Sequence, residues 1–124
     1  MAKTISDLVL DGALDITATG TIMHICSSEP ANRAAAVSAS LADVVLTAGD
    51  GNGDYVIANG DTSGRKITIS QQASMPIDAT GTATHVTISD ASNLLLVTTC
   101  TSQALTSGGT VTVPAFDQEI ADPA

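Results

Sequence analysis

The chain has 124 residues, 44% of them hydrophobic, which is enough for one domain with one core and too little for two ordinary domains. Charged residues make up 14%, with 13 acids against 4 bases, so the net charge is −9. This balance excludes a basic footprint for nucleic acid and disfavours binding to an anionic membrane surface.

Residues 4–17 are expected to form an N-terminal helix. Thr4 followed by Asp7 is a capping pattern. The face that we expect to be buried carries apolar residues at helical spacing, namely Ile5, Leu8, Val9, Ala13 and Ile16. The acidic stripe of Asp7, Asp11 and Asp15 is interpreted as solvated.

Leu10 and Leu14 flank the acidic stripe, so apolar residues cover most of the circumference of the helix. A single sheet cannot cover both apolar sides of a helix. We therefore predict that Leu10 and Leu14 meet a second surface, either a sister subunit or a capsid. The alternative is cover by residues 31–41 of the same chain. On the first reading, changing both leucines to serine weakens assembly and leaves the β-rich body folded.

The rest of the chain indicates short strands separated by turns. We expect strands at 21–27, 41–47, 55–58, 65–70, 82–89, 94–101 and 110–120, with a four-residue hairpin loop at 90–93. Residues 28–41 are expected to be a partial helix or an extended arm. Pro114 is expected to mark a bulge or an edge position. The pattern predicts a single domain over 1–124: an antiparallel sandwich or barrel of seven to eight strands with one N-terminal helix.

Targeting and redox features are few. No apolar run is long enough to span a membrane, and the N-terminus lacks a signal-peptide pattern, so synthesis in a cytosol without export is expected. Cys26 and Cys100 are then expected to be free thiols, with a disulfide as the alternative.

One segment has the spacing of a calcium loop. Asp50, Asn52 and Asp54 place oxygen ligands on alternate residues, and Asp61 falls at the twelfth position. However, Tyr55 stands where such a loop requires glycine, and no helices are expected on either side. A plain turn is the favoured interpretation, with a calcium site as the alternative.

Other candidate chemistry is sparse. Four residues are potential zinc ligands, namely His24, Cys26, His85 and Cys100. Zinc ligands usually come in pairs a few residues apart, and His85 and Cys100 do not form such a pair. The chain has no nucleophile elbow and no phosphate-binding loop, so we expect no enzyme and no cofactor.

The only adjacent basic pair is Arg65 and Lys66, next to an expected hairpin at 59–61. This pair is a candidate contact for an acidic partner surface. The alternative interpretation is a solvated hairpin end.

Five stretches carry a recognisable pattern: ISD (5–7), IMHICS (22–27), ANGDTSGRKITI (58–69), ATGTATHVTISD (79–90) and TSGGTVTVPAFDQEI (106–120). Together they resemble a group of short virion proteins of tailed bacteriophages. Residues 31–55 match least. The resemblance implies a structural protein of the particle and supplies no active site.

The hypothesis that follows is a capsid decoration, or cement, protein on the outside of the phage head. It would bridge neighbouring major capsid subunits, be made in the host cytoplasm and bind neither nucleic acid nor membrane. The resemblance also implies local threefold positions, hence a homotrimer, with a monomer as the alternative. The alternative function is a tail or fibre component that binds a receptor or glycan, although Tyr55 and Phe116 are the only aromatic residues available for sugar stacking.

Overall fold

The computed structural model describes residues 5–122 and is mainly β, with 49% of the chain in strands and 15% in helices. The elements in chain order are α1 (Asp7–Thr17), β1 (Ile22–Cys26), α2 (Arg33–Ala39), β2 (Ser40–Val45), β3 (Tyr55–Asn59), β4 (Arg65–Ile69), β5 (Gln72–Pro76), β6 (Gly81–Ser89), β7 (Leu94–Leu105), β8 (Thr110–Val113) and β9 (Phe116–Ile120). The prediction of a mainly β, antiparallel sandwich with an N-terminal helix is confirmed.

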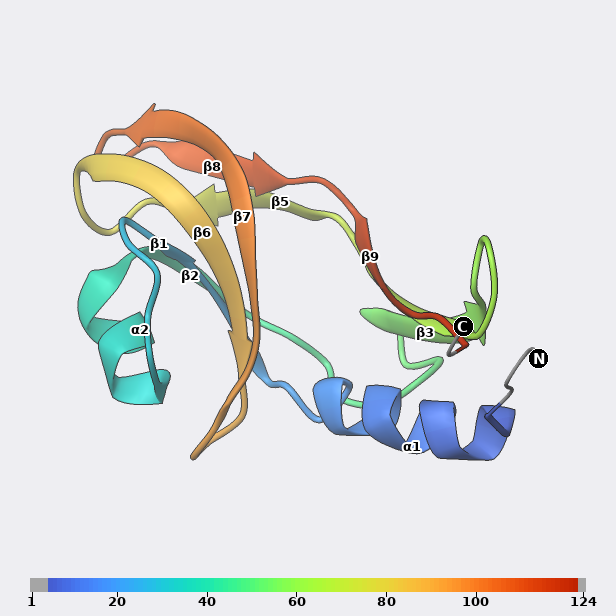
Figure 1. The fold of residues 1–124 in the computed structure, drawn as a ribbon. Helices are drawn as coiled ribbons and strands as arrows, with labels where there is room; N and C mark the ends of the chain where they lie inside the picture. The colour runs from blue at the N-terminus through green and yellow to red at the C-terminus, as the bar shows by residue number, and fades with distance from the viewer. Residues whose placement is uncertain (1–4, 123–124) are drawn as a thin grey trace.

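The strands form three antiparallel sheets. The largest has the order β2-β1-β6-β7, the second β3-β4-β9 and the third β5-β8. A bridge between Ala42 and Ile77 links β2 to the segment after β5. Figure 1 shows β6 and β7 curving together over β1 and β2, while α1 lies beside β3 and β9 at the other end of the molecule.

The β6–β7 hairpin follows from local turn chemistry. The Asp90 carboxylate accepts hydrogen bonds from the backbone N–H groups of Ser92 (2.7 Å) and Asn93 (2.6 Å), which closes the loop. The expected hairpin is therefore confirmed, and β7 continues to Leu105, four residues beyond the predicted end.

The last predicted strand, 110–120, is two strands in different sheets. β8 pairs with β5, and β9 pairs with β4. Pro114 lies between them, and because proline has no backbone N–H it ends the first ladder. This division, together with β5, brings the strands in the described residues to nine instead of the expected seven or eight.

The ambiguous 28–41 segment contains a short helix. Asn32 caps α2, its side-chain oxygen accepting from the backbone N–H of Ala35 at 2.8 Å. Ala36, in the middle of α2, is fully buried, and the chain passes from the helix directly into β2 at Ser40. Neither helix in residues 5–122 has the length and hydropathy needed to cross a bilayer.

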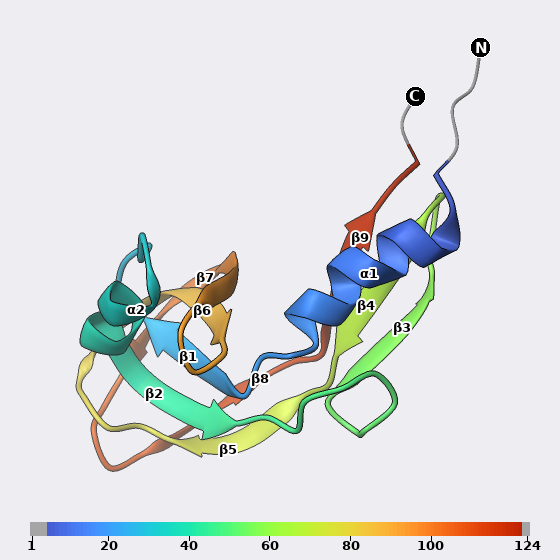
Figure 2. The same ribbon diagram turned by 90° about the horizontal axis from the view of Figure 1, so that it is seen from below.

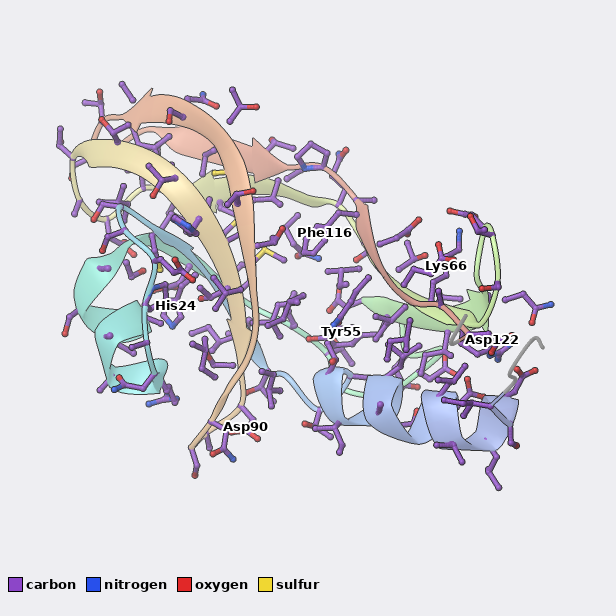
Figure 3. All side chains as sticks on the ribbon, in the orientation of Figure 1. His24, Tyr55, Lys66, Asp90, Phe116 and Asp122 are labelled. Carbon is purple, nitrogen blue, oxygen red and sulfur yellow. The ribbon has the colours of Figure 1, made fainter. Side chains whose placement is uncertain are left out.

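One cluster of buried apolar side chains draws on α1 and on strands of all three sheets. Tyr55 is completely buried, and its hydroxyl donates to the carbonyl oxygen of Gly20 at 2.8 Å. Figure 3 shows Tyr55 near the middle of the molecule, close to the C-terminal end of α1. A Cβ at Gly20 would collide with the side chains of Ile88 and Tyr55, so this close approach requires glycine.

Candidate functional site

Helix α1 begins at Asp7, with Ser6 as its N-cap. The Ser6 hydroxyl accepts from the backbone N–H of Leu8 at 3.2 Å, which satisfies one free donor of the first turn. The predicted start at Thr4 lies outside the described residues. The helix ends at Thr17, and the N–H of Ala18 closes the last turn on the carbonyl of Leu14 at 2.9 Å.

The buried face of α1 is opposite to the predicted one. Leu10 and Leu14 are 4% and 0% exposed, and with Thr17 they form the face of α1 that turns inward. The prediction that these leucines meet a sister subunit or a capsid is therefore wrong, because their own chain covers them. The alternative, cover by the same chain, is confirmed, but the main contact of α1 is with β4 and not with the suggested residues 31–41.

An ion pair fixes this orientation. The guanidinium of Arg65 on β4 donates to both carboxylate oxygens of Asp11, at 2.7 and 3.3 Å, and to the side-chain oxygen of Asn59 at 2.8 Å. The bidentate contact turns Asp11 toward β4, on the same side of the helix as Leu10 and Leu14, which face inward. The same contact raises the pKa of Arg65, chiefly through its hydrogen bond to Asp11.

Both residues of the basic pair bind acids of their own chain. Lys66 donates to Asp61 at 2.8 Å and to Asp117 at 3.4 Å. Arg65 and Lys66 are both paired with acids of their own chain, and their role as interface residues stays a prediction. They hold α1, the β3–β4 hairpin and β9 together.

The outer face of α1 carries the exposed apolar residues. Leu8, Val9 and Ile16 are 81%, 63% and 61% exposed. At 100° per residue they share one side of the helix with Gly12 and Ala13, and Ile5 lies on the same side just before the first turn. Asp15 borders this side, whereas Asp7 lies on the opposite side of the helix with Asp11, which is turned toward β4. Figure 2 shows α1 in front of β4 and β9, so the outer face is turned toward the viewer.

The possible calcium ligands do not converge. Asp50 accepts from the backbone N–H of Ile57 at 2.9 Å, and the Asn52 amide donates to the carbonyl of Ala48 at 2.9 Å. Asp61 lies beyond the far end of β3, where Lys66 binds it.

Asp54 has its own partners. Its carboxylate accepts from the N–H of Thr47 at 2.6 Å and from the side chains of Ser70 and Gln72 at 3.0 and 3.1 Å. Burial raises the pKa of Asp54, but these hydrogen bonds outweigh it and leave the pKa below its ordinary value. The segment is a turn whose carboxylates cap backbone and side-chain donors.

The potential zinc ligands are also dispersed. Cys26 is buried and Cys100 is partly exposed, and both are free thiols, as expected. The Cys26 thiol donates to the carbonyl of Ala36 at 3.5 Å. His85 shares a hydrogen bond with the neighbouring Thr84 hydroxyl at 2.8 Å. Within residues 5–122, no group of three or more metal-binding side chains gathers.

His24 is buried beneath α2, as Figure 3 illustrates, and shares a 3.0 Å hydrogen bond with Ser40 through Nδ1. The Ser40 hydroxyl also lies within hydrogen-bond distance, 3.2 Å, of the carbonyl of Ala42. Burial lowers the pKa of His24, and nearby Arg33 lowers it further against the opposing effect of Asp43.

Sequence reasoning missed the outer face of α1 because it assigned the same residues to the core.

Comparison of the chain with protein-family models, curated protein sequences and solved structures found no match.

Proposed function

We propose that the chain is a non-enzymatic structural protein of a tailed-phage particle, most simply a capsid decoration protein on the outside of the head. The observation that carries the proposal is the outer face of α1, where Leu8, Val9 and Ile16 lie exposed on a helix whose other face is anchored. Together with the sequence resemblance, this unpartnered face supports a role in docking.

Rigid presentation makes the outer face suited to docking. Leu10, Leu14 and the Arg65–Asp11 pair hold α1 on its own sheet. The helix therefore loses little conformational entropy when a partner covers its other side. Fully burying an exposed leucine or isoleucine contributes roughly 1.5–3 kcal/mol. Across many copies on a capsid, such contacts would add interface area over the joints between subunits and raise resistance to internal DNA pressure.

The charges beside this face restrict its partner. Asp15 borders the apolar residues, and the whole chain has a net charge of −9. A complementary surface of the major capsid protein is therefore apolar at its centre with lysine or arginine at its rim. Two copies paired antiparallel through α1 would instead bring the same acidic flanks together, which disfavours a twofold dimer through this face.

We also propose that three copies form a closed ring at a local threefold position of the capsid. In such a ring each copy offers two different surfaces to its neighbours, so identical acidic flanks do not have to meet. Sedimentation of the purified chain at high concentration tests this: a mass of three chains is expected, and a mass of one chain would contradict it.

Location in the particle tests the main proposal. Mass spectrometry of purified heads without tails should recover the chain in many copies per head. Absence from tail-less heads would overturn the capsid assignment, and recovery with tails in few copies would favour the tail or fibre alternative.

The outer face is tested with a double substitution, Leu8→Ser with Ile16→Ser. We expect the amount bound to heads to fall at least tenfold with an unchanged melting temperature, because both side chains are exposed. The matched control is Val37→Ser with Val56→Ser, which removes two exposed apolar side chains away from α1. Equal binding of the two double variants would contradict the assignment of this face.

A further inference from the structure

A groove lies between β7 and β8, which Figure 1 shows in the upper part of the molecule with α1 at the bottom, and it reaches Phe116 and Asp117 of β9. It consists of two adjoining hollows of about 360 and 340 Å³ that share Val86, Cys100, Val113 and Pro114. Further apolar lining comes from Ile25, Leu105 and Val111. We call it the β7–β8 groove. Its size lies at the lower end of the range of about 300–1,000 Å³ for binding pockets.

Strands with free edges border this groove. β7 is the last strand of the four-stranded sheet, and β8 is an edge of the two-stranded sheet. Within the described residues no ladder joins β7 to β8. An edge strand presents unpaired N–H and C=O groups, which is the surface that another extended chain recognises.

β7 lacks most of the features that protect an edge from pairing. Its twelve residues, Leu94–Leu105, contain no charged residue, proline or glycine. Two bulges are its protective features: residues 100–102 lie opposite Thr84 alone, and Leu95 lies between the pairs Ile88–Leu96 and Ser89–Leu94. The first of these bulges also brings Cys100 and Thr101 to the groove lining.

The groove is electrically neutral in a strongly acidic chain. None of the eleven residues that line the first hollow is charged. Asp117, at the end of the second hollow, already accepts hydrogen bonds from Thr68 (2.7 Å) and Lys66 (3.4 Å). The complementary occupant is therefore an uncharged extended segment with apolar side chains at alternate positions.

A second copy of this chain does not supply such a segment from its described residues. Its uncharged extended segments are strands already held in sheets, whereas a strand placed between two edges needs both of its own edges free.

We propose that an extended segment of the major capsid subunit adds a strand along the free edge of β7 and directs alternate apolar side chains into the β7–β8 groove. This inference rests on the proposed function. It gives the protein a second contact surface besides the outer face of α1, and bridging two subunits requires two such surfaces.

The chain contains a native reporter of groove occupancy. Cys100 lines both hollows, while Cys26 is fully buried, so alkylation of the folded protein reports on Cys100. The probe is the synthetic peptide KTVTVTVK, in which valine and threonine alternate. At saturating peptide, the rate of Cys100 alkylation by N-ethylmaleimide at pH 8 is expected to fall at least fivefold. The same peptide methylated on every internal backbone amide is expected to give no protection, because it cannot donate to a strand edge.

A matched pair of variants places the effect on the β7 edge. Thr101→Lys puts a charge on the exposed edge of β7 in the groove and should abolish protection, with Gln103→Lys as the second variant if the first does not fold. Val56→Lys puts the same charge on β3, away from the groove, and should keep protection.

Protection by the methylated peptide, or none by KTVTVTVK, would overturn strand addition. Cys100 protection that grows with protein concentration alone, with a doubled sedimentation mass, would show that a second copy is the occupant. In purified heads Cys100 should be protected, and labelling as fast as in the free chain would overturn the capsid subunit as the source. These readings of Cys100 are separate from the presence of the chain in heads, which tests the proposed function itself.

Discussion

Helix α1 has two apolar faces, and only its inner face contributes to the stability of the fold. Leu14 is 0% exposed on the inner face, so Leu14→Ala leaves a cavity between α1 and the chain beneath it. Such changes lower the free energy of unfolding by about 2–5 kcal/mol. Leu8→Ala removes the same atoms from a side chain that is 81% exposed, and should change it by no more than about 0.5 kcal/mol.

The comparison is made by urea denaturation, followed by far-UV circular dichroism and by the fluorescence of Tyr55, the only tyrosine. With a slope of about 1–3 kcal/mol per molar urea, the Leu14→Ala midpoint should fall by roughly 1 M or more. The Leu8→Ala midpoint should stay close to that of the parent protein.

Equal losses for the two variants, or a larger loss for Leu8→Ala, would refute the observed orientation of α1. The pair Leu10→Ser with Leu14→Ser separates the two readings in the same way. The sequence predicts lost assembly with an intact fold, whereas the structure predicts a lower midpoint, because both side chains lie in the chain's own interior.

Three further changes test single contacts. Gly64→Ala should lower the free energy of unfolding by more than about 1 kcal/mol, because φ is +69° and a Cβ would overlap a backbone carbonyl at the end of β9. Tyr55→Phe should lower it by about 1–3 kcal/mol, because the buried carbonyl of Gly20 loses its donor. Burial holds the pKa of His24 below 6.5, so the unfolded chain binds a proton first and stability should fall as the pH drops below about 6.5. His24→Gln should remove this pH dependence and His85→Gln should keep it.

Each of these predictions has a measurement and a result that would contradict it. Urea midpoints test Gly64→Ala, and Gly12→Ala on open helix surface is the control that should gain about 0.5–1 kcal/mol. A Tyr55→Phe midpoint equal to the parent's would contradict the buried hydrogen bond. Melting curves between pH 5 and 8 test His24, and a slope that survives His24→Gln would assign the dependence to another group.

Much of the β-rich body could be predicted from local pattern. Alternation at 65–70 and 82–89 located β4 and β6, and the Asp90 loop located the hairpin to β7. These features depend on side-chain alternation and turn chemistry within a few residues, so they can be predicted from the sequence alone.

The candidate site was harder to predict from the sequence, because α1 is apolar on two sides. Periodicity establishes that Leu8 and Leu14 lie on different faces, but it does not determine which face meets the sheet. The choice depends on Arg65, 54 residues from Asp11, and on a sheet that exists only after β3, β4 and β9 pair.

The sequence by itself determined α1, most of the strands, the antiparallel class and the absence of charge in β7. The tertiary structure decided which face of α1 is buried, that Arg65 and Lys66 bind their own acids, and that Pro114 divides two sheets. The physical reason is the range of the interactions. Backbone preference and alternation act over a few residues, whereas the ion pairs and the sheet edges join segments that meet only when the whole chain packs.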